Sequence, residues 1–446
     1  MKIDRGFAEE VISRAVRREV DQAEIFVKSS KNLSIEIKDQ VVDSLKSSQG
    51  FGYSIRIIKD GRLGFSYSTG PEDVDSVIGN ALEAAKYADK DGYLDLPSDA
   101  GAAEVEVFDP AIQEIGEDEA IEKVRLLERS VYATDLRIKR VRKAAASFTV
   151  SETEIVNSKS VGVRYESTSC SAQIMGVAEE GRESRIGWDF DASRFLREIS
   201  FEKIGRNAAN NAIRLLGSRK IEGGKAYVIL DNSVTVDFLG VFASSLSSEA
   251  VQKGKSFLAG RLGKKVISSK LNVSDSGLLP GRLGSRPVDD EGAPQKEKVV
   301  ICEGVLRTYL YNTYTAKKEG TISTGNAVRG SFSSTPSVGV TNLFVDGVSK
   351  SDTIPKEGLF GSIDRGLYVV DAMGIHTANP VTGDFSVGVS GVWIEHGEMK
   401  YPVREAVISG NVLEFFERIE AVGDDLRFYG SIGGPSLIIP DVDISS

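Results

Sequence analysis

The sequence predicts an α+β fold of two domains, an N-terminal helix and sheet domain over residues 1–217 and a β-rich, antiparallel or barrel-like domain over residues 225–446. The first observation is size. The 446 residues, 41% hydrophobic and 27% charged, exceed what one hydrophobic core usually organises. The second is a change of pattern. Helical and strand periodicities alternate in the first half, whereas short apolar runs separated by Gly, Ser, Asn and Asp clusters fill the second.

The first half opens with a helix, because apolar residues recur at helical spacing over 7–16. Apolar and polar residues then alternate over 23–28 and again over 33–37, which predicts two half-buried strands. The pair Asp60-Gly61 stands between two further alternating runs. It predicts a hairpin, since both residue types accept positive φ.

The rest of this half combines helices with antiparallel strands. Strands fill 144–190, with turns at Asn157-Ser158 and Glu180-Gly181. The last helix ends at Gly217, where a C-cap glycine belongs, and the domain boundary is predicted in 217–224. The three helices are expected over 74–85, 118–131 and 201–216.

In the second half, only two helices stand out, over 234–253 and 411–419. The long Gly/Ser/Thr stretch 319–337 is typical of a functional or mobile loop. Apolar runs predict strands over 226–230, 299–302, 339–345, 367–370 and 385–393.

Charge and composition exclude several functions. With 55 basic and 65 acidic residues, the net charge of −10 disfavours nucleic acid as a partner. No run approaches the ~18 apolar residues of a membrane span, so we expect a cytoplasmic protein without membrane contact. The cysteines Cys170 and Cys302 are too few for a disulfide framework, and each is expected to be a buried reduced thiol.

Familiar hydrolytic motifs are missing. The only histidines, His376 and His396, cannot form the HExxH arrangement of zinc proteases, and the chain holds no Gly-x-Ser-x-Gly element. The fold could still bring the two histidines close together, because residues distant in sequence often meet in a folded chain. Asp384 and the cluster Asp289, Asp290 and Glu291 would be further members of such a site.

A set of ordered phrases in the second half resembles the TldD/PmbA family, and its PmbA (TldE) branch more than its TldD branch. The phrases are VDDEG at 288–292, STGNAVR at 323–329, TNL at 341–343, TGDFS at 382–386, VGDDL at 422–426 and GSIGGPSL at 430–437. The resemblance implies a two-domain member of a cytosolic zinc metalloprotease system, whose complete form pairs two homologous subunits.

In the TldD branch, the resemblance places a His-Glu-x-x-x-His zinc motif on a helix that corresponds to 234–253 here. That segment contains no histidine, and the late segment 427–435 has no cysteine. The resemblance therefore implies no catalytic residue, metal or other cofactor in this chain. It implies zinc in a TldD-like partner subunit.

The loop around 323–334 offers candidate contacts. Gly325 allows close backbone approach, and Arg329 is suited to hold a carboxylate bidentately. We take Gly325, Asn326, Arg329, His376 and Asp384 as candidate contacts to a peptide or partner subunit. The alternatives are a turn-stabilising loop and, for Asp384, a simple turn acid.

Three functions follow from the sequence. The first is a non-metal TldE/PmbA-like subunit that pairs with a TldD-like subunit to cleave unfolded peptides. The second is an autonomous hydrolase built on His376, His396, Asp384 or the 289–291 cluster. The third is a peptide-binding scaffold without chemistry, as a homo-oligomer. The sequence does not separate a heterodimer from a homodimer.

Overall fold

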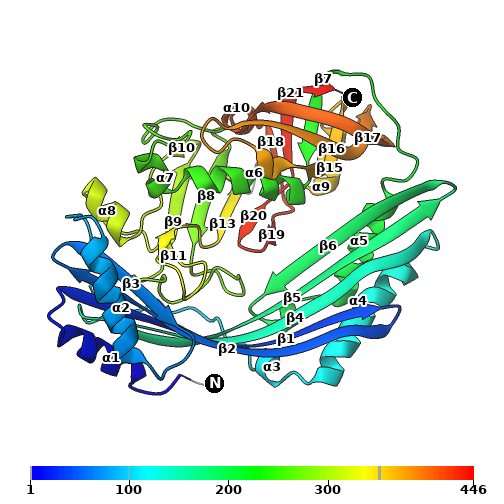
Figure 1. Ribbon diagram of the computed structural model, residues 1–446. Helices are drawn as coiled ribbons and strands as arrows, with labels where there is room; N and C mark the ends of the chain where they lie inside the picture. The colour runs from blue at the N-terminus through cyan, green and yellow to red at the C-terminus, as the bar shows by residue number, and fades with distance from the viewer. Residues whose placement is uncertain (1–2, 99, 350–352, 446) are drawn as a thin grey trace.

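The computed structural model describes residues 3–98, 100–349 and 353–445 (Figure 1). Its first half contains α1 (Phe7–Val16), β1 (Gln22–Lys38), β2 (Val41–Lys59), β3 (Arg62–Ser68), α2 (Val74–Tyr87), α3 (Pro110–Glu114), α4 (Glu117–Thr134), β4 (Ile138–Asn157), β5 (Gly162–Glu180), β6 (Glu183–Ser193), η1 (Leu196–Glu198) and α5 (Phe201–Ile213).

One antiparallel sheet organises this half, in the order β3-β2-β1-β4-β5-β6. The strands β1, β2, β4 and β5 have 17 to 20 residues each, so the sheet is roughly 60 Å long at about 3.3 Å per residue. The sheet curves, and the C-terminal half of the chain lies over its concave side (Figure 1).

Two helix pairs cover the two ends of this sheet and leave its middle bare. The pair α1 and α2 packs on residues of β1 up to Val27, and the pair α4 and α5 packs on residues from Leu33 onward. Between these two cores, neither cluster includes residues 28–32 of β1, 149–154 of β4 or 165–169 of β5. We call these three segments the waist.

At each covered end of the sheet, one helix packs directly against the backbone of a strand. A Cβ on Gly64 would lie 2.0 Å from the carbonyl oxygen of Ala81 in α2, and a Cβ on Gly187 would lie 2.2 Å from that of Ala208 in α5. Glycine is therefore required at both strand positions, because any side chain would push the helix away.

The predicted hairpin at Asp60-Gly61 is confirmed, with positive φ at both residues and β2 paired to β3 around them. The two short strands predicted over 23–28 and 33–37 are wrong in number, since both belong to the single strand β1. The polar residues 28–32 between the two predicted strands belong to neither hydrophobic core, but the strand continues through them. The predicted end of the helix at Gly217 is also wrong. The chain leaves α5 after Ile213 through tighter turns, and Gly217 then takes φ 76°.

The second half contains β7 (Gly224–Leu230), α6 (Asn232–Ser245), α7 (Ser248–Gln252), β8 (Leu271–Ser276), β9 (Glu297–Cys302), β10 (Val305–Leu306), α8 (Thr313–Glu319), β11 (Ala327–Val328), β12 (Ser337–Val338), β13 (Leu343–Gly347), β14 (Thr353–Ile354), α9 (Lys356–Gly361), β15 (Arg365–Met373), η3 (Ile375–Thr377), β16 (Asp384–Glu395), β17 (Glu398–Asn411), α10 (Val412–Glu417), β18 (Ala421–Gly423), β19 (Arg427–Tyr429), β20 (Ile432–Gly434) and β21 (Leu437–Ser445).

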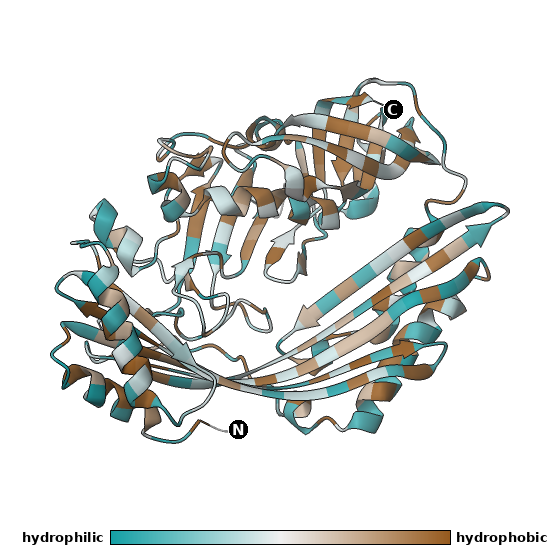
Figure 2. Ribbon diagram, in the orientation of Figure 1, coloured by the Kyte–Doolittle hydropathy of each residue, from teal (hydrophilic) through white to brown (hydrophobic). Residues whose placement is uncertain are grey.

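Its strands form a barrel-like sheet, a second, open sheet, and a two-stranded sheet of β11 and β12. In the first, β7, β15, β16, β17 and β21 close into a ring, because β21 pairs with both β17 and β7. The second has the order β10-β9-β8-β13-β20-β19. Helix α6 packs into the core of this half, where Phe238 lies 5.0 Å from Phe385 and 5.4 Å from Phe415 between ring centroids. Apolar residues dominate these shorter strands, whereas the long strands of the first sheet alternate (Figure 2).

The α+β class is confirmed, but the helices of this half differ from the prediction. The helix expected over 234–253 is two helices, because Leu246 and Ser247 break it and Ser247 caps α7. Helices α8 and α9 were not predicted, although Asn312 and Thr315 form a capping box that starts α8.

Within the described ranges, the first sheet takes no strand from beyond residue 193, and the three C-terminal sheets take none from before 224. The boundary at 217–224 stays a prediction. None of the helices in the described ranges combines the length and apolar character needed to cross a membrane.

Candidate functional site

A buried ion network joins the long sheet to the C-terminal half. Arg56 on β2 donates to Glu24 on β1 over 2.7 Å and to Glu291 over 2.8 Å, and all three side chains are at most 9% exposed. Arg329 pairs with the other carboxylate oxygen of Glu24. Asp290 accepts from Arg286 over 2.6 Å and from the backbone N–H of Arg329 over 2.7 Å. Of the acidic cluster predicted as a possible reactive site, Glu291 therefore connects the two halves of the chain, and Asp290 forms its hydrogen bonds within the second half.

Burial and the neighbouring carboxylates act in opposite directions on the pKa of the two arginines in this network. Burial alone would lower the pKa of Arg56, but the carboxylates of Glu24 and Glu291 outweigh it and raise this pKa. Burial lowers the pKa of Arg329 despite its contact with Glu24. Burial and the neighbouring Glu291 raise the pKa of Asp289, whose two oxygens accept from three backbone N–H groups.

The predicted loop residues Gly325 and Asn326 lie inside the protein. Gly325 has φ 73°, and a Cβ there would lie 2.8 Å from the carbonyl oxygen of Pro294. The side chain of Asn326 donates to Asp275 and to the carbonyl of Gly339 over 2.8 and 2.9 Å. These contacts match the turn-stabilising alternative for the two residues, and a role in peptide or partner contact stays a prediction.

Arg329 holds a carboxylate, as its type suggested, but through one nitrogen and inside the same chain. Its Nη1 donates to the carbonyl of Ser334 over 2.8 Å and its Nε to that of Asp290 over 3.1 Å. The exposed part of this loop begins at Gly330.

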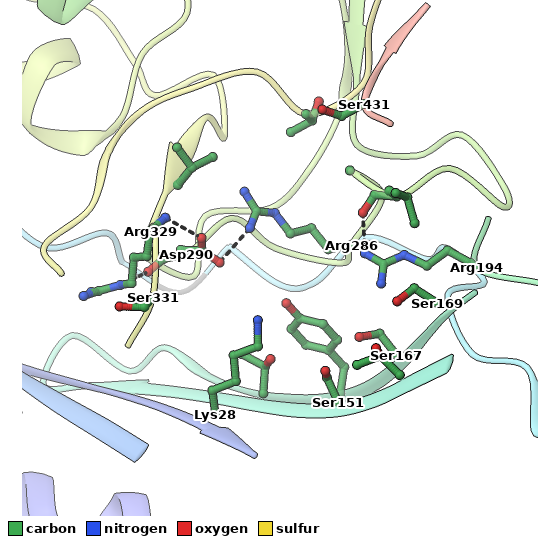
Figure 3. Close-up of a pocket in the computed structure, with 18 of the residues that line it drawn as sticks. Lys28, Ser151, Ser167, Ser169, Arg194, Arg286, Asp290, Arg329, Ser331 and Ser431 are labelled. Carbon is green, nitrogen blue, oxygen red and sulfur yellow. Dashed lines mark hydrogen bonds and ion pairs between the residues drawn. The ribbon is translucent and has the colours of Figure 1, made fainter. Parts of the chain in front are cut away.

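A cavity of about 600 Å³ lies beside this network, between the waist of the sheet and the C-terminal loops. Figure 3 shows Lys28, Ser151, Ser167 and Ser169 on the sheet side, with Arg286 and Ser431 opposite them. The cavity is lined by Phe26, Lys28, Thr149, Ser151, Thr153, Tyr165, Ser167, Ser169, Arg194, Leu283, Gly284, Arg286, Asp290, Val328, Arg329, Gly330, Ser331, Val340, Thr341, Gly430 and Ser431.

The floor of the cavity is a ladder of hydroxyl groups. Three residues of β4 stand directly opposite three of β5, and all six line the cavity; the pairs are Thr149 with Ser169, Ser151 with Ser167, and Thr153 with Tyr165. Lys28 on β1 is paired with Thr153, so its side chain stands in the same row. Alternate residues of a strand share one face, which places this polar set on the concave side of the sheet.

Helix α6 was the expected place of a metal motif. It borders a second cavity of about 450 Å³, to which it contributes Ala243 and Ser244, with Val338 to Val340 on the other side. Hydroxyl and methyl side chains do not fit zinc, which prefers imidazole, thiolate and carboxylate ligands. Within the described ranges, no three His, Cys, Asp or Glu residues lie together in a way that suits a metal ion.

The two histidines are not brought together. His376 lies in η3, before β16, and its side chain is outside the described part of the structure. His396 follows the last residue of β16, with its Nδ1 2.9 Å from Asp364 and its side chain 84% exposed. His396 lies at the end of β15 that begins with Arg365, and His376 follows the other end of β15 at Met373. The eight residues between these two ends of the strand span roughly 26 Å.

Asp384 is an exposed turn acid. Its oxygens accept from Asn411 over 2.9 Å and from Thr382 over 2.7 Å, and these two hydrogen bonds lower its pKa. Neither Asp384 nor His396 lines the cavity on the waist. Contact of Asp384 with a peptide or partner stays a prediction.

Sequence reasoning missed the cavity residues Lys28 and Arg194. No motif surrounds either of them, because they meet only in the fold. The hydroxyl residues at 149, 151 and 153 do alternate in the sequence, but they lie on the face opposite the helices, where an antiparallel sheet commonly carries polar residues, so this pattern did not indicate a site.

Comparisons with known proteins agree along the whole chain. Three sequence models of one family match: PmbA/TldA metallopeptidase domain 1 at residues 23–85, the central domain at 110–216 and the C-terminal domain at 223–446. A metalloprotease PmbA homolog from Haemophilus influenzae is 30% identical over 95% of this chain and 92% of its own.

Two solved structures share the fold. A proposed modulator of a DNA gyrase from Thermotoga maritima is 27% identical with a TM-score of 0.91, covering 98% of this chain and 99% of its own. TldE from Thermococcus kodakarensis is 25% identical with a TM-score of 0.89, covering 99% of this chain and 100% of its own.

Proposed function

Because the chain belongs to the PmbA/TldD family of metallopeptidases, we propose that it is the metal-free, TldE-like subunit of a two-subunit zinc peptidase that cleaves unfolded peptides. The observation that carries this proposal is helix α6. The resemblance places the zinc motif of the TldD branch on this helix, whereas here it presents Ala243 and Ser244 to the adjacent cavity.

The rest of the C-terminal half suits a wall of a substrate chamber. The open sheet ends on one side in the short edge strand β19, whereas the segment 263–265 already pairs with β10 at the other side. An exposed strand edge accepts an extended peptide through backbone hydrogen bonds, which need no particular side chains. Such binding favours an unfolded segment over a folded protein. Zinc and the general base would then come from the TldD-like subunit.

The test is reconstitution. The chain is purified alone and with the TldD-like subunit of the same organism, and three quantities are measured: zinc per chain, the mass of the complex by light scattering, and cleavage of an unstructured peptide. We expect no bound zinc and no cleavage from the chain alone, and a stoichiometric complex that cleaves. Cleavage by the lone chain at the rate of the pair would refute the proposal.

A control separates this proposal from an autonomous hydrolase. The variants His396→Ala and Asp384→Asn change exposed residues of the alternative site. We expect the reconstituted pair to keep its activity with either variant. Loss of activity without loss of the complex would place the chemistry in this chain.

A further inference from the structure

We propose that the cavity on the waist is a binding site for the carboxylate group of a peptide. The inference concerns this chain alone, so it holds whether or not the chain pairs with a metal-bearing subunit. It is carried by two cations that form no ion pair with a carboxylate of the described residues, by the hydroxyl ladder, and by the size of the cavity, which admits several residues.

The positive charges of the cavity exceed its negative charges. Arg286 is matched by Asp290, and Arg329 by Glu24. Arg194 has no carboxylate partner among the described residues. Its Nη1 donates to the carbonyl of Thr168 and its Nη2 to those of Leu283 and Ser285. A guanidinium that has lost water and gained only carbonyls favours an anion nearby.

Lys28 is the second cation of this kind. It makes no hydrogen bond or ion pair to any described residue, although Thr153 stands beside it on the sheet. Burial lowers the pKa of Lys28, the charge of Asp290 acts in the opposite direction, and the charges of Arg194 and Arg286 lower this pKa further. An anion in the cavity would relieve the repulsion among these three cations, and the lysine ammonium is free to donate to it.

The available donors favour a carboxylate over a phosphate. Phosphate sites are usually built from helix N-termini, glycine-rich loops or bidentate arginines. Here the terminal nitrogens of Arg194 and Arg286 are already occupied by carbonyls or by Asp290. What remains is one ammonium and a row of hydroxyls, which matches the single charge and two oxygens of a carboxylate. The other hydroxyls of the ladder then face the amide groups of the ligand.

The experiment uses isothermal titration calorimetry on the full chain with an acetylated, unstructured decapeptide of Ala, Ser and Gly. The peptide is made with a free C-terminus, with a C-terminal amide, and as an amide that carries one Glu side chain. We expect the free acid or the Glu peptide to bind at least about tenfold more tightly than the plain amide, as one charge-assisted hydrogen bond provides. The tighter of the two identifies the source of the carboxylate.

Two lysine variants locate the binding. Lys28→Met removes the ammonium and keeps the length of the side chain, and it should abolish the difference between acid and amide. Lys38→Met changes an exposed lysine on the same face of the same strand, ten positions away, and should leave the difference unchanged.

Three results would overturn the inference. These are equal binding of acid and amide, an acid preference that survives in Lys28→Met, and displacement of the peptide acid by inorganic phosphate at concentrations where acetate has no effect. None of them bears on whether the chain pairs with a zinc subunit, so failure here and failure of the proposed function are distinguishable.

Discussion

The ends of the long sheet and its waist are made of the same strands, yet they are stabilised differently. At the ends, β1 buries Ile25 and Val27 under α1 and α2, and Ile35 and Ile37 under α4 and α5. At the waist, the strands carry hydroxyls and Lys28 toward the C-terminal half. A strand therefore continues through a polar stretch when hydrogen bonds to its neighbours on both sides continue. The comparison teaches that the same strands serve two purposes, because their helix-facing side builds the cores at the two ends and their opposite side lines the cavity at the waist.

The largest expected effect comes from breaking the ion network that fixes the C-terminal half over the sheet. Arg56→Met leaves the buried carboxylates of Glu24 and Glu291 without their shared partner. We expect a loss of about 3–5 kcal/mol in the free energy of unfolding, measured by urea denaturation. Arg14→Met removes the exposed ion pairs of this α1 residue with Glu10 and with Asp75 of α2, and the loss should be far smaller. Equal losses would show that the network contributes no more than a surface pair.

A second test compares the two faces of β5. Ile174→Val removes one methyl group from the core under α4 and α5 and should cost about 0.5–1.5 kcal/mol. Ser167→Ala removes a hydroxyl from the waist, where no described group is bonded to it, and should stay within about 0.5 kcal/mol. The free energies of unfolding of both variants are measured by urea denaturation and compared with that of the wild type. A larger loss for Ser167→Ala would assign the hydroxyl ladder to stability.

A third test uses the two cysteines as reporters. Cys170 is fully buried under the helix-covered end, and burial raises its pKa to about 12. Cys302 is partly exposed on β9. At pH 8 we expect a thiol reagent to modify one cysteine per native chain, and two after denaturation, as followed by mass spectrometry. Fast modification of Cys170 would mean that α4 and α5 leave the sheet readily, contrary to the contrast drawn above.

The smallest effect concerns a carboxylate in the C-terminal half. Burial and the neighbouring Asp371 raise the pKa of Asp237 on α6 to about 6. Between pH 4 and 6 the folded chain therefore binds more protons at this site than the unfolded chain, and stability falls as pH rises. The melting temperature of Asp237→Asn relative to the wild type should rise over this range and level off above it.

Asp384→Asn is the control of opposite sign. Hydrogen bonds from Asn411 and Thr382 lower the pKa of Asp384, so its contribution is present above the usual pKa of an aspartate and is lost as pH falls below it. Its difference from the wild type should change only below about pH 4. A constant difference for Asp237→Asn from pH 4 to 7 would contradict the assignment.

Local signals in the sequence were sufficient for much of the fold. The hairpin at Asp60-Gly61 depends on backbone preferences of two adjacent residues, and the helix at 74–85 on a regular apolar stripe. The continuity of β1 was not readable, because Ser30 to Asn32 are held by pairing with β2 and β4, which are distant in sequence.

The candidate site was harder to predict from the sequence, because its residues also come together only through contacts between distant parts of the chain. Arg329 stood in a recognisable phrase, and its affinity for a carboxylate was predictable from its type, but its partner Glu24 lies 305 positions away. Lys28 and Arg194 belong to no phrase at all. Their chemistry arises only when the C-terminal loops close over the waist.

The distances along the chain also set an order of events during synthesis. The pairing of β1 with β4 waits until residue 157 has emerged, and the partners of Glu24 and Arg56 are not complete until Glu291 and Arg329 follow. Contacts between such distant residues slow folding. A nascent chain stopped before residue 291 would thus carry all six strands of the sheet, with Glu24 and Arg56 paired to each other, while its concave face still lacks the loops that cover it in the complete chain.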